Sequence, residues 1–317
     1  MQTTLNRRRG GGGKRGAAPE LAGVGAQAAS FVKLARQYAN GMPVWITETG
    51  YDINQGSPFH ALSTGRKTAL ETQADWILRT ALLFSRVGID RVFFFQAYDD
   101  NPANPVQFSS MGLLNTDKTR KPAADYIYQA MNLLGDYRYK ESLKPVGGPS
   151  DLLIDRYELN GRSSYVLMIP DERDRTDTYT LAIPKGDTVQ ICTPTAGRDQ
   201  MTRRIQVSQT GTIRLSVSET PVFVVPVSIS APDLSTLQFV SAPSTNSVDL
   251  LVENNSLSPV EISVYNSTGQ RFRQVSLPKS GRIFRTQLDL RQLPKGNYLL
   301  AVQQGKARVV RKWVKAQ

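Results

Sequence analysis

The stretch 44-VWITETGYD-52 places a short apolar run directly before a carboxylate, Glu48, and a turn-forming pair, Thr49-Gly50. The residues before the glutamate favour a strand, and the glycine lets the backbone turn sharply after it. A glutamate in this position is either an ordinary solvated strand end or a side chain directed into a reaction site. Both interpretations make this stretch a strand that ends at Glu48.

The segments on either side of this stretch alternate between helix and strand. Apolar residues recur at helical spacing over 26–40 and again over 67–87, RVFFFQAY predicts a second strand over 91–98, and a helix over 121–134 begins beside Pro122. Strands that are apolar on both faces belong in a parallel sheet covered by helices. Two such strands alone leave both sheet edges unpaired, so the segment is expected to be part of a larger sheet.

The helix expected over 67–87 is amphipathic. Its polar side carries Glu71, Asp75, Arg79 and Arg86, which are expected to face water, and Trp76 is expected in the core. Acidic pairs such as Glu71 and Asp75 are therefore interpreted as a solvated helix face and not as an acid/base couple.

Polar side chains gather where the two strands end. Reactive groups of parallel α/β proteins collect at the carboxyl ends of the strands, and neighbouring strands lie about 4.8 Å apart. Glu48 is therefore expected to share a site with the groups that end the next strand, which are Gln96, Tyr98, Asp99 and Asp100.

The loop after Glu48 supplies weaker candidates. Tyr51, Asp52 and Asn54 could hold a sugar through an aromatic face and short polar groups, but such residues are also typical of turns. His60, the only histidine, lies in the same loop and is either a substrate contact or simply exposed. Both interpretations stay open for these residues.

From about residue 150 the pattern changes to alternating β-strands. Tyr179, Leu181 and Ile183 alternate with polar residues, and turn signals between such runs favour an antiparallel β-sandwich over 150–228. A Ser-, Ala- and Pro-rich linker is predicted over 229–247, and a second small sandwich over 248–317. Residues 1–24, with their Arg-Gly block, are expected to be disordered, and 25–140 to form the helical domain.

The formal charge of +12 belongs to the two ends of the chain. Residues 1–16 carry five Lys and Arg and no acid, and residues 268–317 carry twelve against Asp289 alone, so residues 17–267 have a net charge of −4. Nucleic-acid binding fits poorly, since the tail's charges alternate along strands without a set of stacking aromatics. The single Cys192 excludes an intrachain disulfide and a cysteine-based zinc cluster.

A first resemblance covers about residues 25–228. PVWITETGYD, DRVFFFQAYDD and SSMGLLNTDKTRKPAADYIYQAMNLLGDY, followed by SETPVFV, resemble the final quarter of the retaining (β/α)8-barrel glycoside hydrolases and the β-sandwich that often trails the barrel. The resemblance implies that Glu48 is the nucleophile at the end of the seventh strand, that Gln96 and Tyr98 belong to the substrate pocket, and that no cofactor or metal is needed. The fold class it implies is the last two strand–helix units of a barrel followed by all-β domains.

The chain departs from that family's pattern in a way that bears on activity. The family's acid/base glutamate belongs to an Asn-Glu pair at the end of the fourth strand, and no Asn-Glu pair precedes Glu48 here. Six of the eight strand–helix units of a barrel are missing. We therefore expect a truncated piece of a longer enzyme that lacks turnover on its own and exposes apolar surface on its partial barrel.

The tail carries a second resemblance, over about 245–317. VYNSTGQRF, LDLRQLPKGNYLLAV and RVVRKWVKAQ resemble the C-terminal sorting domain of the Por-type (type nine) secretion system, with Gly296, Tyr298 and Leu300 in its GxYxL strand. This implies a protein exported to the exterior of a Gram-negative outer membrane, with the secretion machinery as a partner. Neither a Sec-type signal nor an apolar run long enough for a membrane helix is visible, so the true amino terminus is expected to be missing.

Two classes of function follow. The first is a secreted or surface-attached glycosidase fragment whose substrate is a polysaccharide or oligosaccharide, cleaved by double displacement. The alternative is a non-catalytic exported β-sandwich protein that binds carbohydrate or has a structural role. The sequence leaves open which glycan is bound and whether attack is internal or terminal.

Overall fold

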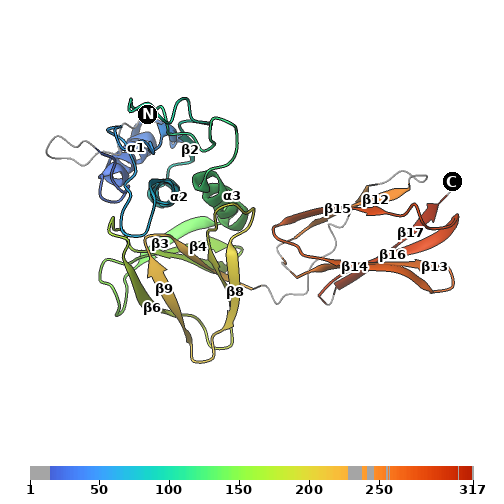
Figure 1. Ribbon diagram of the computed structural model, residues 1–317. Coiled ribbons are helices and arrows are strands. Elements are labelled where there is room, and N and C mark those ends of the chain that lie inside the picture. Colours follow the sequence, from blue (N-terminus) through green and yellow to red (C-terminus); the bar gives the residue numbers. More distant parts are fainter. Residues whose placement is uncertain are drawn as a thin grey trace. The chain divides into compact units, whose positions relative to one another are not determined.

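The computed structural model describes residues 15–227, 238–240, 246–254, 256, 258–305 and 307–315. The chain forms two compact units, Met1–Pro226 and Val227–Gln317, and both are rich in strands (Figure 1). The helices all lie in the first unit, within the described ranges. None of them has both the length and the apolar character that crossing a membrane requires.

The amino-terminal part of unit 1 alternates helices with strands, as the sequence predicts. Its elements are α1 (Val24–Tyr38), β1 (Trp45–Thr49), α2 (Ala69–Val87), β2 (Arg91–Phe94) and α3 (Pro122–Leu134). Strands β1 and β2 pair in parallel, which confirms the predicted direction. Helix α2 begins with a capping box, in which Thr68 and Glu71 satisfy each other's backbone amides, and it ends at Gly88, whose φ is 88°.

One face of the β1–β2 sheet is covered and the other is open. Ile46 is fully buried in a cluster with α1 and α2, in which Val32, Leu83 and Phe84 take part. On neighbouring positions Trp45 and Phe93 remain 46% and 47% exposed, and their rings lie 6.0 Å apart. Apolar strands predict cover on both faces, and among the described residues only one face of this sheet has it.

The rest of unit 1 is antiparallel and surrounds two hydrophobic cores. A six-stranded sheet has the order β3-β4-β5-β10-β7-β8, and β6 and β9 form a separate two-stranded sheet. The register of β6 with β9 brings Tyr179 opposite Leu215 and Leu181 opposite Ile213. The strand bounds are β3 (Arg138–Leu143), β4 (Leu153–Leu159), β5 (Arg162–Met168), β6 (Thr176–Ala182), β7 (Thr188–Thr193), β8 (Thr202–Val207), β9 (Thr212–Ser218) and β10 (Val222–Pro226).

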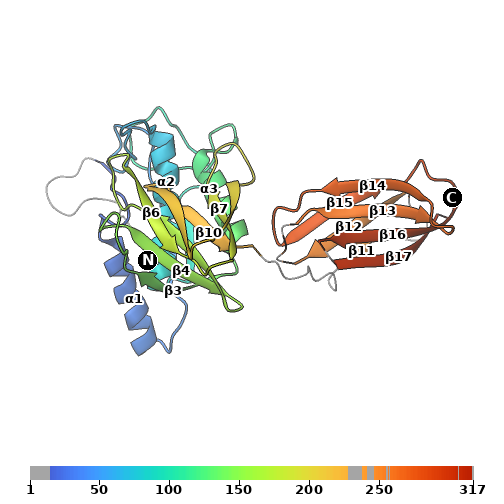
Figure 2. The same cartoon turned by 90° about the horizontal axis from the view of Figure 1, so that it is seen from below.

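The six-stranded sheet lies between the helices and the β6–β9 pair (Figure 1), and in the view from below the strands overlap α2 (Figure 2). Trp76 and Leu78 of α2 share a core with Met168 and Phe223 of the sheet. On its other face, Leu167 and Val224 of the sheet pack with residues of β6 and β9. Strand β3 pairs with β4 although it precedes the predicted start of the sandwich at residue 150, so the sheet receives a strand from the segment assigned to the helical domain.

Glu71 on the polar side of α2 is exposed as expected, but Asp75 and Arg79 are buried and Arg86 is largely covered, which corrects the expectation that they face water. Arg79 is fully buried and donates to both carboxylate oxygens of Glu20, with the shortest distance 2.6 Å. Asp75 is also buried, accepts from Lys67 Nζ at 2.6 Å, and has a pKa raised by its burial. Arg86 donates to Asp155 of β4 at 2.7 Å. The polar stripe is therefore an ion-paired contact with neighbouring parts of unit 1, while Trp76 lies in the core as expected.

Residues 15–23 are packed, although the sequence predicts disorder for 1–24. Ala17 and Ala18 are fully buried, Gly16 N donates to His60 O, and Ala18 N donates to Glu172 Oε1 at 2.7 Å. The glycine- and alanine-rich composition hides this, because small residues fit between the helices and the sandwich without an apolar pattern. Residues 1–14 lie outside the described residues.

Unit 2 consists of two antiparallel sheets around one core. The sheet orders are β11-β12-β15 and β14-β13-β16-β17, and the strand bounds are β11 (Gln238–Val240), β12 (Ser247–Glu253), β13 (Val260–Asn266), β14 (Arg271–Leu277), β15 (Ile283–Asp289), β16 (Gly296–Gln304) and β17 (Ala307–Lys315). The core takes Val248 and Leu250 from one sheet and Leu300 and Trp313 from the other. Strand β11 pairs with β12 inside the predicted 229–247 linker; 228–237 and 241–245 lie outside the described residues.

Two buried lysines tie loops of unit 2 together. Lys279 Nζ donates to the carbonyl oxygens of Asn254, Ser256 and Gly281 at 2.6–2.8 Å. Lys315 Nζ, near the end of β17, donates to those of Leu290, Arg291 and Leu293 at 2.7–3.0 Å. Each ammonium group thus uses all three of its N–H donors on backbone carbonyls.

Candidate active site

Glu48 lies in β1 one residue before the strand ends, and its side chain is half-buried. The parallel register shifts between Ile46 and Thr49, so the glutamate sits at an irregularity of the ladder. A glycine is required at position 50 because the backbone of Phe95 lies close to it. A Cβ atom on residue 50 would lie 2.4 Å from the Phe95 carbonyl oxygen, and Phe95 N donates to Thr49 O at 2.8 Å. The glycine of the TETG stretch therefore permits the close approach of the chain that follows β2, next to Glu48.

Gln96 and Tyr98 follow the carboxyl end of β2. The parallel pairing puts them at the same edge of the sheet as Glu48, as expected from the sequence. Gln96 is half-buried, its Nε2 donates to Phe108 O at 3.1 Å, and the peptide bond before it is cis. Tyr98 is exposed, and the ammonium group of Lys118 lies over its ring.

Two residues predicted to contact substrate from the loop after Glu48, Tyr51 and His60, are internal. Tyr51 is fully buried, packs edge-on against Trp76 at 5.0 Å, and donates to Ala17 O at 3.0 Å; burial raises its pKa. His60 is largely buried, with Nδ1 2.6 Å from Ser57 O. These positions correct the prediction, because in this structure neither side chain can reach a sugar from solvent.

Asp52 is likewise internal, and it organises the loops behind the strand ends. Its Oδ2 accepts from Ser57 Oγ at 2.5 Å and from Phe108 N at 2.9 Å. Its Oδ1 accepts from the amide and the hydroxyl of Ser110 at 2.9 and 3.1 Å. The carboxylate is fully buried and fully occupied by these four donors, so it holds the chain and does not contact a ligand.

Asp99 is the fourth predicted contact that lies inside. Its Oδ1 accepts from Gly112 N at 2.8 Å and from Lys121 Nζ at 2.6 Å, and both members of the ion pair are buried. Burial lowers the pKa of Lys121. Asp100, the next residue, is exposed, and Asn54 closes a turn by accepting from Gly56 N at 2.9 Å.

Neither Asp52 nor Asp99 supplies the second carboxylate of a retaining glycosidase. Asp52 and Asp99 are both buried and hydrogen-bonded to backbone amides, so neither can protonate a leaving group in solvent. Over the described ranges, no group of three or more His, Cys, Asp and Glu side chains is arranged to hold a metal ion.

The loop of residues 100–112 has a conformational feature that sequence reasoning missed. Phe108 is partly exposed, and it has a φ of 76°, in the left-handed region that a bulky side chain rarely adopts. Its ring contacts Phe59 and Phe95. No sequence signal indicates a positive φ at a phenylalanine, so this residue could be found only from the structure.

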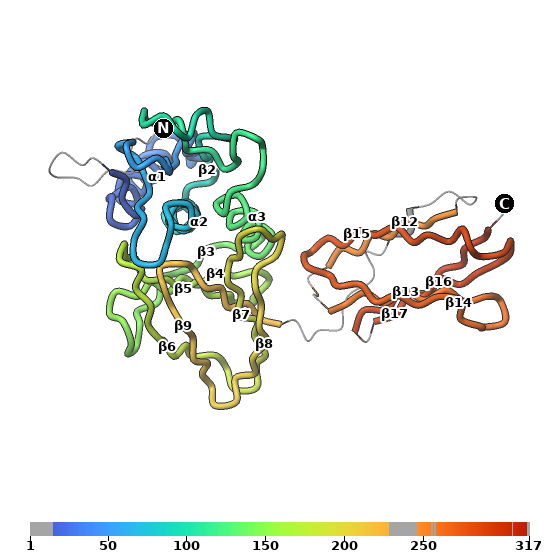
Figure 3. The backbone as a smooth tube through the Cα atoms, in the orientation of Figure 1, coloured from blue at the N-terminus to red at the C-terminus, as the bar shows by residue number. Residues whose placement is uncertain are grey.

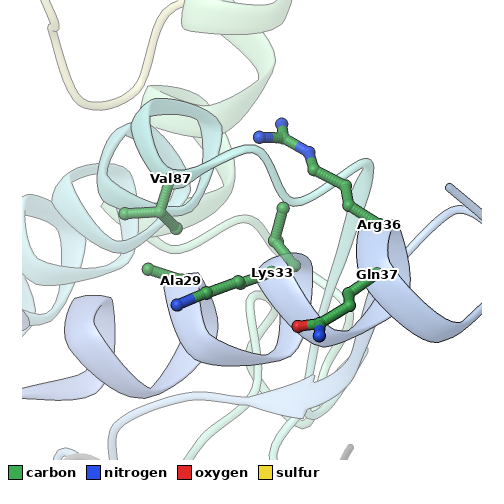
Figure 4. A pocket seen from close by; sticks show the side chains of 6 residues that line it. Ala29, Lys33, Arg36, Gln37 and Val87 are labelled. Atoms are coloured by element: carbon green, nitrogen blue, oxygen red, sulfur yellow. The ribbon is translucent and has the colours of Figure 1, made fainter.

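Two cavities of about 440 Å³ each lie away from the strand ends. One lies along α1, where Ala29, Lys33, Arg36 and Gln37 face Val87 of α2 (Figure 4). The other is lined by polar residues of the sandwich side, including Asp171, Glu172 and Arg175. Neither cavity is lined by a residue that the sequence singled out as a site residue.

Several solved structures that are similar to this chain are glycoside hydrolases. A family 39 glycoside hydrolase from Bacteroides cellulosilyticus WH2 is 19% identical with a TM-score of 0.47, over 63% of this chain and 37% of that one. A GH30 endoxylanase from Clostridium papyrosolvens C71 is 10% identical with a TM-score of 0.43, over 63% and 46%. A β-porphyranase of family 86 from Bacteroides plebeius is 12% identical with a TM-score of 0.37, over 93% and 60%. The chain thus spans less than two thirds of each, and no curated protein matches it.

The carboxyl-terminal part matches a family model. Residues 242–316 match the secretion system C-terminal sorting domain, which confirms the resemblance found in the GxYxL strand and in the terminal strand. Tyr298 and Trp313 of these strands are both buried, with ring centroids 5.7 Å apart. The chain therefore carries a type nine secretion sorting domain, which directs it to the cell surface or the exterior.

Proposed function

We propose that this chain is part of a secreted glycoside hydrolase in which Glu48 attacks the anomeric carbon of a polysaccharide or oligosaccharide. The parallel pairing of β1 with β2 is the observation that carries the proposal, because it puts Glu48 and Gln96 at one edge of one sheet. A retaining glycosidase needs an ionised carboxylate at such an edge, and neighbouring polar groups that bind the hydroxyls of the sugar. Gln96 and Tyr98 take this second role.

The architecture proposed is the end of a barrel. Residues 25–140 correspond to the last two strand–helix units of a (β/α)8 barrel, residues 150–228 to the trailing sandwich, 229–247 to a linker and 248–317 to an Ig-like sorting domain. The open face of β1–β2 supports this, because Trp45 and Phe93 are placed where the side chains of further strands fill a complete barrel.

The chemistry would run in two steps. The Glu48 carboxylate attacks the anomeric carbon as the leaving oxygen departs, and water then displaces the carboxylate with net retention. A second carboxyl group has to protonate the leaving oxygen and later activate the water. Since Asp52 and Asp99 are committed elsewhere, we expect the 317-residue chain to release no sugar from natural glycans by itself.

An activated substrate tests the nucleophile separately. A 2,4-dinitrophenyl β-glycoside needs no acid because dinitrophenolate departs unprotonated, and azide can displace the sugar from Glu48 without a general base. We expect the full chain to release dinitrophenolate in an azide-dependent reaction that forms a β-glycosyl azide, and Glu48→Gln to abolish it. Glu141→Gln, at an exposed glutamate of β3, is the control. No azide-dependent product from the unaltered chain would remove Glu48 as a nucleophile.

The burial of four predicted substrate contacts favours a second candidate function, carbohydrate binding without cleavage. Tyr51, Asp52, His60 and Asp99 all have structural partners, as expected for an exported protein that binds carbohydrate without cleaving it. Binding of an oligosaccharide by both the full chain and Glu48→Gln, without any azide-dependent product, would support this alternative.

A further inference from the structure

Phe108 occupies a backbone conformation that its side chain disfavours. Its φ of 76° lies in the left-handed region, where a bulky residue is strained unless the surroundings impose the conformation. The residue lies between β2 and α3, in the loop that Figure 3 traces from the end of β2. It is 36% exposed, so the strain is not offset by complete burial of the ring.

Two buried carboxylates impose that conformation. Asp52 accepts from Phe108 N and from Ser110 N, both at 2.9 Å, and so fixes the backbone on either side of Ser109. Asp99 accepts from Gly112 N at 2.8 Å and is itself held by Lys121. Both aspartates are buried, so these bonds are protected from water. The loop is thus built to hold residue 108 in one place.

The ring of Phe108 packs against two other aromatic rings, one stacked with it and one edge-on. Phe59, which is largely buried, stacks with it at 5.6 Å with the ring planes 17° apart. Phe95, directly after β2, meets it edge-on at 5.9 Å and 78°. These contacts restrict the ring so that its exposed part has a defined orientation.

The position of Phe108 links it to the candidate active site. Gln96 Nε2 donates to the Phe108 carbonyl oxygen at 3.1 Å, and Gln96 shares the edge of the sheet with Glu48. A rigid, partly exposed ring beside a hydrogen-bonding amide is the arrangement that holds a sugar, since the ring contacts the C–H face and the amide binds hydroxyl groups.

We propose that Phe108 is a specificity-determining platform for a glycan, packing against the flat C–H face of a pyranose whose hydroxyl groups are equatorial. This deepens the proposed function and rests on it for the role of Glu48. β-Linked glucose and xylose present such a face, whereas mannose carries an axial hydroxyl at C2. The ligand class is therefore a chain of β-linked pyranoses whose hydroxyl groups are equatorial, for which glucan and xylan oligosaccharides are the probes.

The test is an NMR titration of the full chain with cellohexaose, xylohexaose and mannohexaose, which measures the affinity for each oligosaccharide. Phe108→Gly is the informative variant, because glycine accepts a φ of 76° and removes the ring while the Asp52 bond to the backbone amide remains possible. We expect the affinity for cellohexaose or xylohexaose to fall by roughly tenfold or more, since an aromatic contact is worth about one tenfold step. The thermal midpoint is expected to stay unchanged or to rise.

Two further variants define the result. Phe108→Trp keeps a ring and is expected to keep binding, and Phe31→Ala removes a similarly exposed ring from α1 without effect. The proposal is overturned if Phe108→Gly binds as tightly as the unaltered chain, if mannohexaose binds as well as the other two, or if the unaltered chain binds none of them. Binding that depends on Phe108, together with a failed azide reaction, would remove the catalytic role of Glu48 and leave the platform standing.

Discussion

The parallel β1–β2 sheet and the six-stranded antiparallel sheet of unit 1 are made from similarly apolar strands, but they are covered differently. Phe223 of the antiparallel sheet is fully buried, because helices cover one face of that sheet and β6–β9 the other. Phe93 of the parallel sheet is 47% exposed, because cover exists on one face alone among the described residues. Apolar side chains on a strand thus indicate that both faces of its sheet should be covered. They do not show whether the described chain supplies that cover.

The largest expected effect compares one substitution in both sheets. Phe223→Ala should lower the free energy of unfolding by about 3–5 kcal/mol, because it leaves a cavity in a closed core. Phe93→Ala should cost about 1 kcal/mol, because roughly half of that ring already contacts water. Urea unfolding of the full chain, followed through Trp76 with Trp45 and Trp313 replaced by Phe in both backgrounds, measures the difference. Equal losses would mean that the open face of β1–β2 is covered in solution.

The second prediction concerns the buried ion pair between Arg79 of α2 and Glu20, in the segment that precedes α1. Arg79→Met should lower the free energy of unfolding by about 3 kcal/mol, because the carboxylate of Glu20 then stays buried without its partner. Arg66→Met removes an exposed arginine that pairs with Asp174 at 3.3 Å, and it should change stability by less than about 0.5 kcal/mol.

The same urea experiment separates these two variants. A loss at Arg79→Met no larger than that at Arg66→Met would show that water reaches the buried pair.

A smaller effect is expected at Tyr51, which the sequence offered as a sugar contact. Tyr51→Phe removes the hydroxyl that donates to Ala17 O and should cost about 1 kcal/mol in the unfolding free energy. Oligosaccharide affinity should not change, because the ring is fully buried. A drop in affinity without a drop in stability would restore Tyr51 to the binding site.

The smallest expected effect is a pH dependence of the stability of unit 1, caused by a hydrogen bond between its helical part and its sandwich. Asp174 of the sandwich accepts from the backbone amide of Arg66, and this bond lowers the pKa of the carboxyl group. The folded chain therefore keeps Asp174 ionised to a lower pH than the unfolded chain does. Stability from this bond is complete above the ordinary pKa of an aspartate, near about 4, and is lost as the pH falls through the lowered value. Asp174→Asn should flatten this part of the stability curve of unit 1, and an unchanged slope below about pH 4 would contradict the assignment.

The sequence predicts the elements of unit 1 well because periodicity reports local structure. The parallel direction of the strands that contain Glu48 and Phe93 and the alternating strands around Tyr179 are found as expected, although the second parallel strand ends at Phe94 and not at residue 98. The interpretation of α2 is wrong for Asp75 and Arg79, because a polar stripe shows which side is polar but not whether it meets water or an oppositely charged partner. Arg79 and its partner Glu20 are 59 residues apart, so no local pattern connects them.

The sequence predicts that Glu48, Gln96 and Tyr98 share an edge of the sheet, and their role in binding or catalysis stays a prediction. Strand ends indicate where side chains gather, which is why these three share an edge of the sheet. Asp52 is read equally well as a sugar ligand and as a loop anchor, because both roles need the same short acceptor. Only the four donors that surround it distinguish the two. Phe108 lacks even an ambiguous signal, since its conformation is imposed from elsewhere in the chain.

Lys279 and Lys315 of unit 2 hold loops together by hydrogen bonds, without a disulfide or a bound metal ion. An ammonium group with three carbonyl ligands occupies the place that a bound cation often takes in an extracellular loop, but it is covalently part of the chain. It can be neither extracted by a chelator nor diluted away after export. The two loops that Lys279 and Lys315 close should therefore keep their shape in any ionic medium that the sorted protein enters.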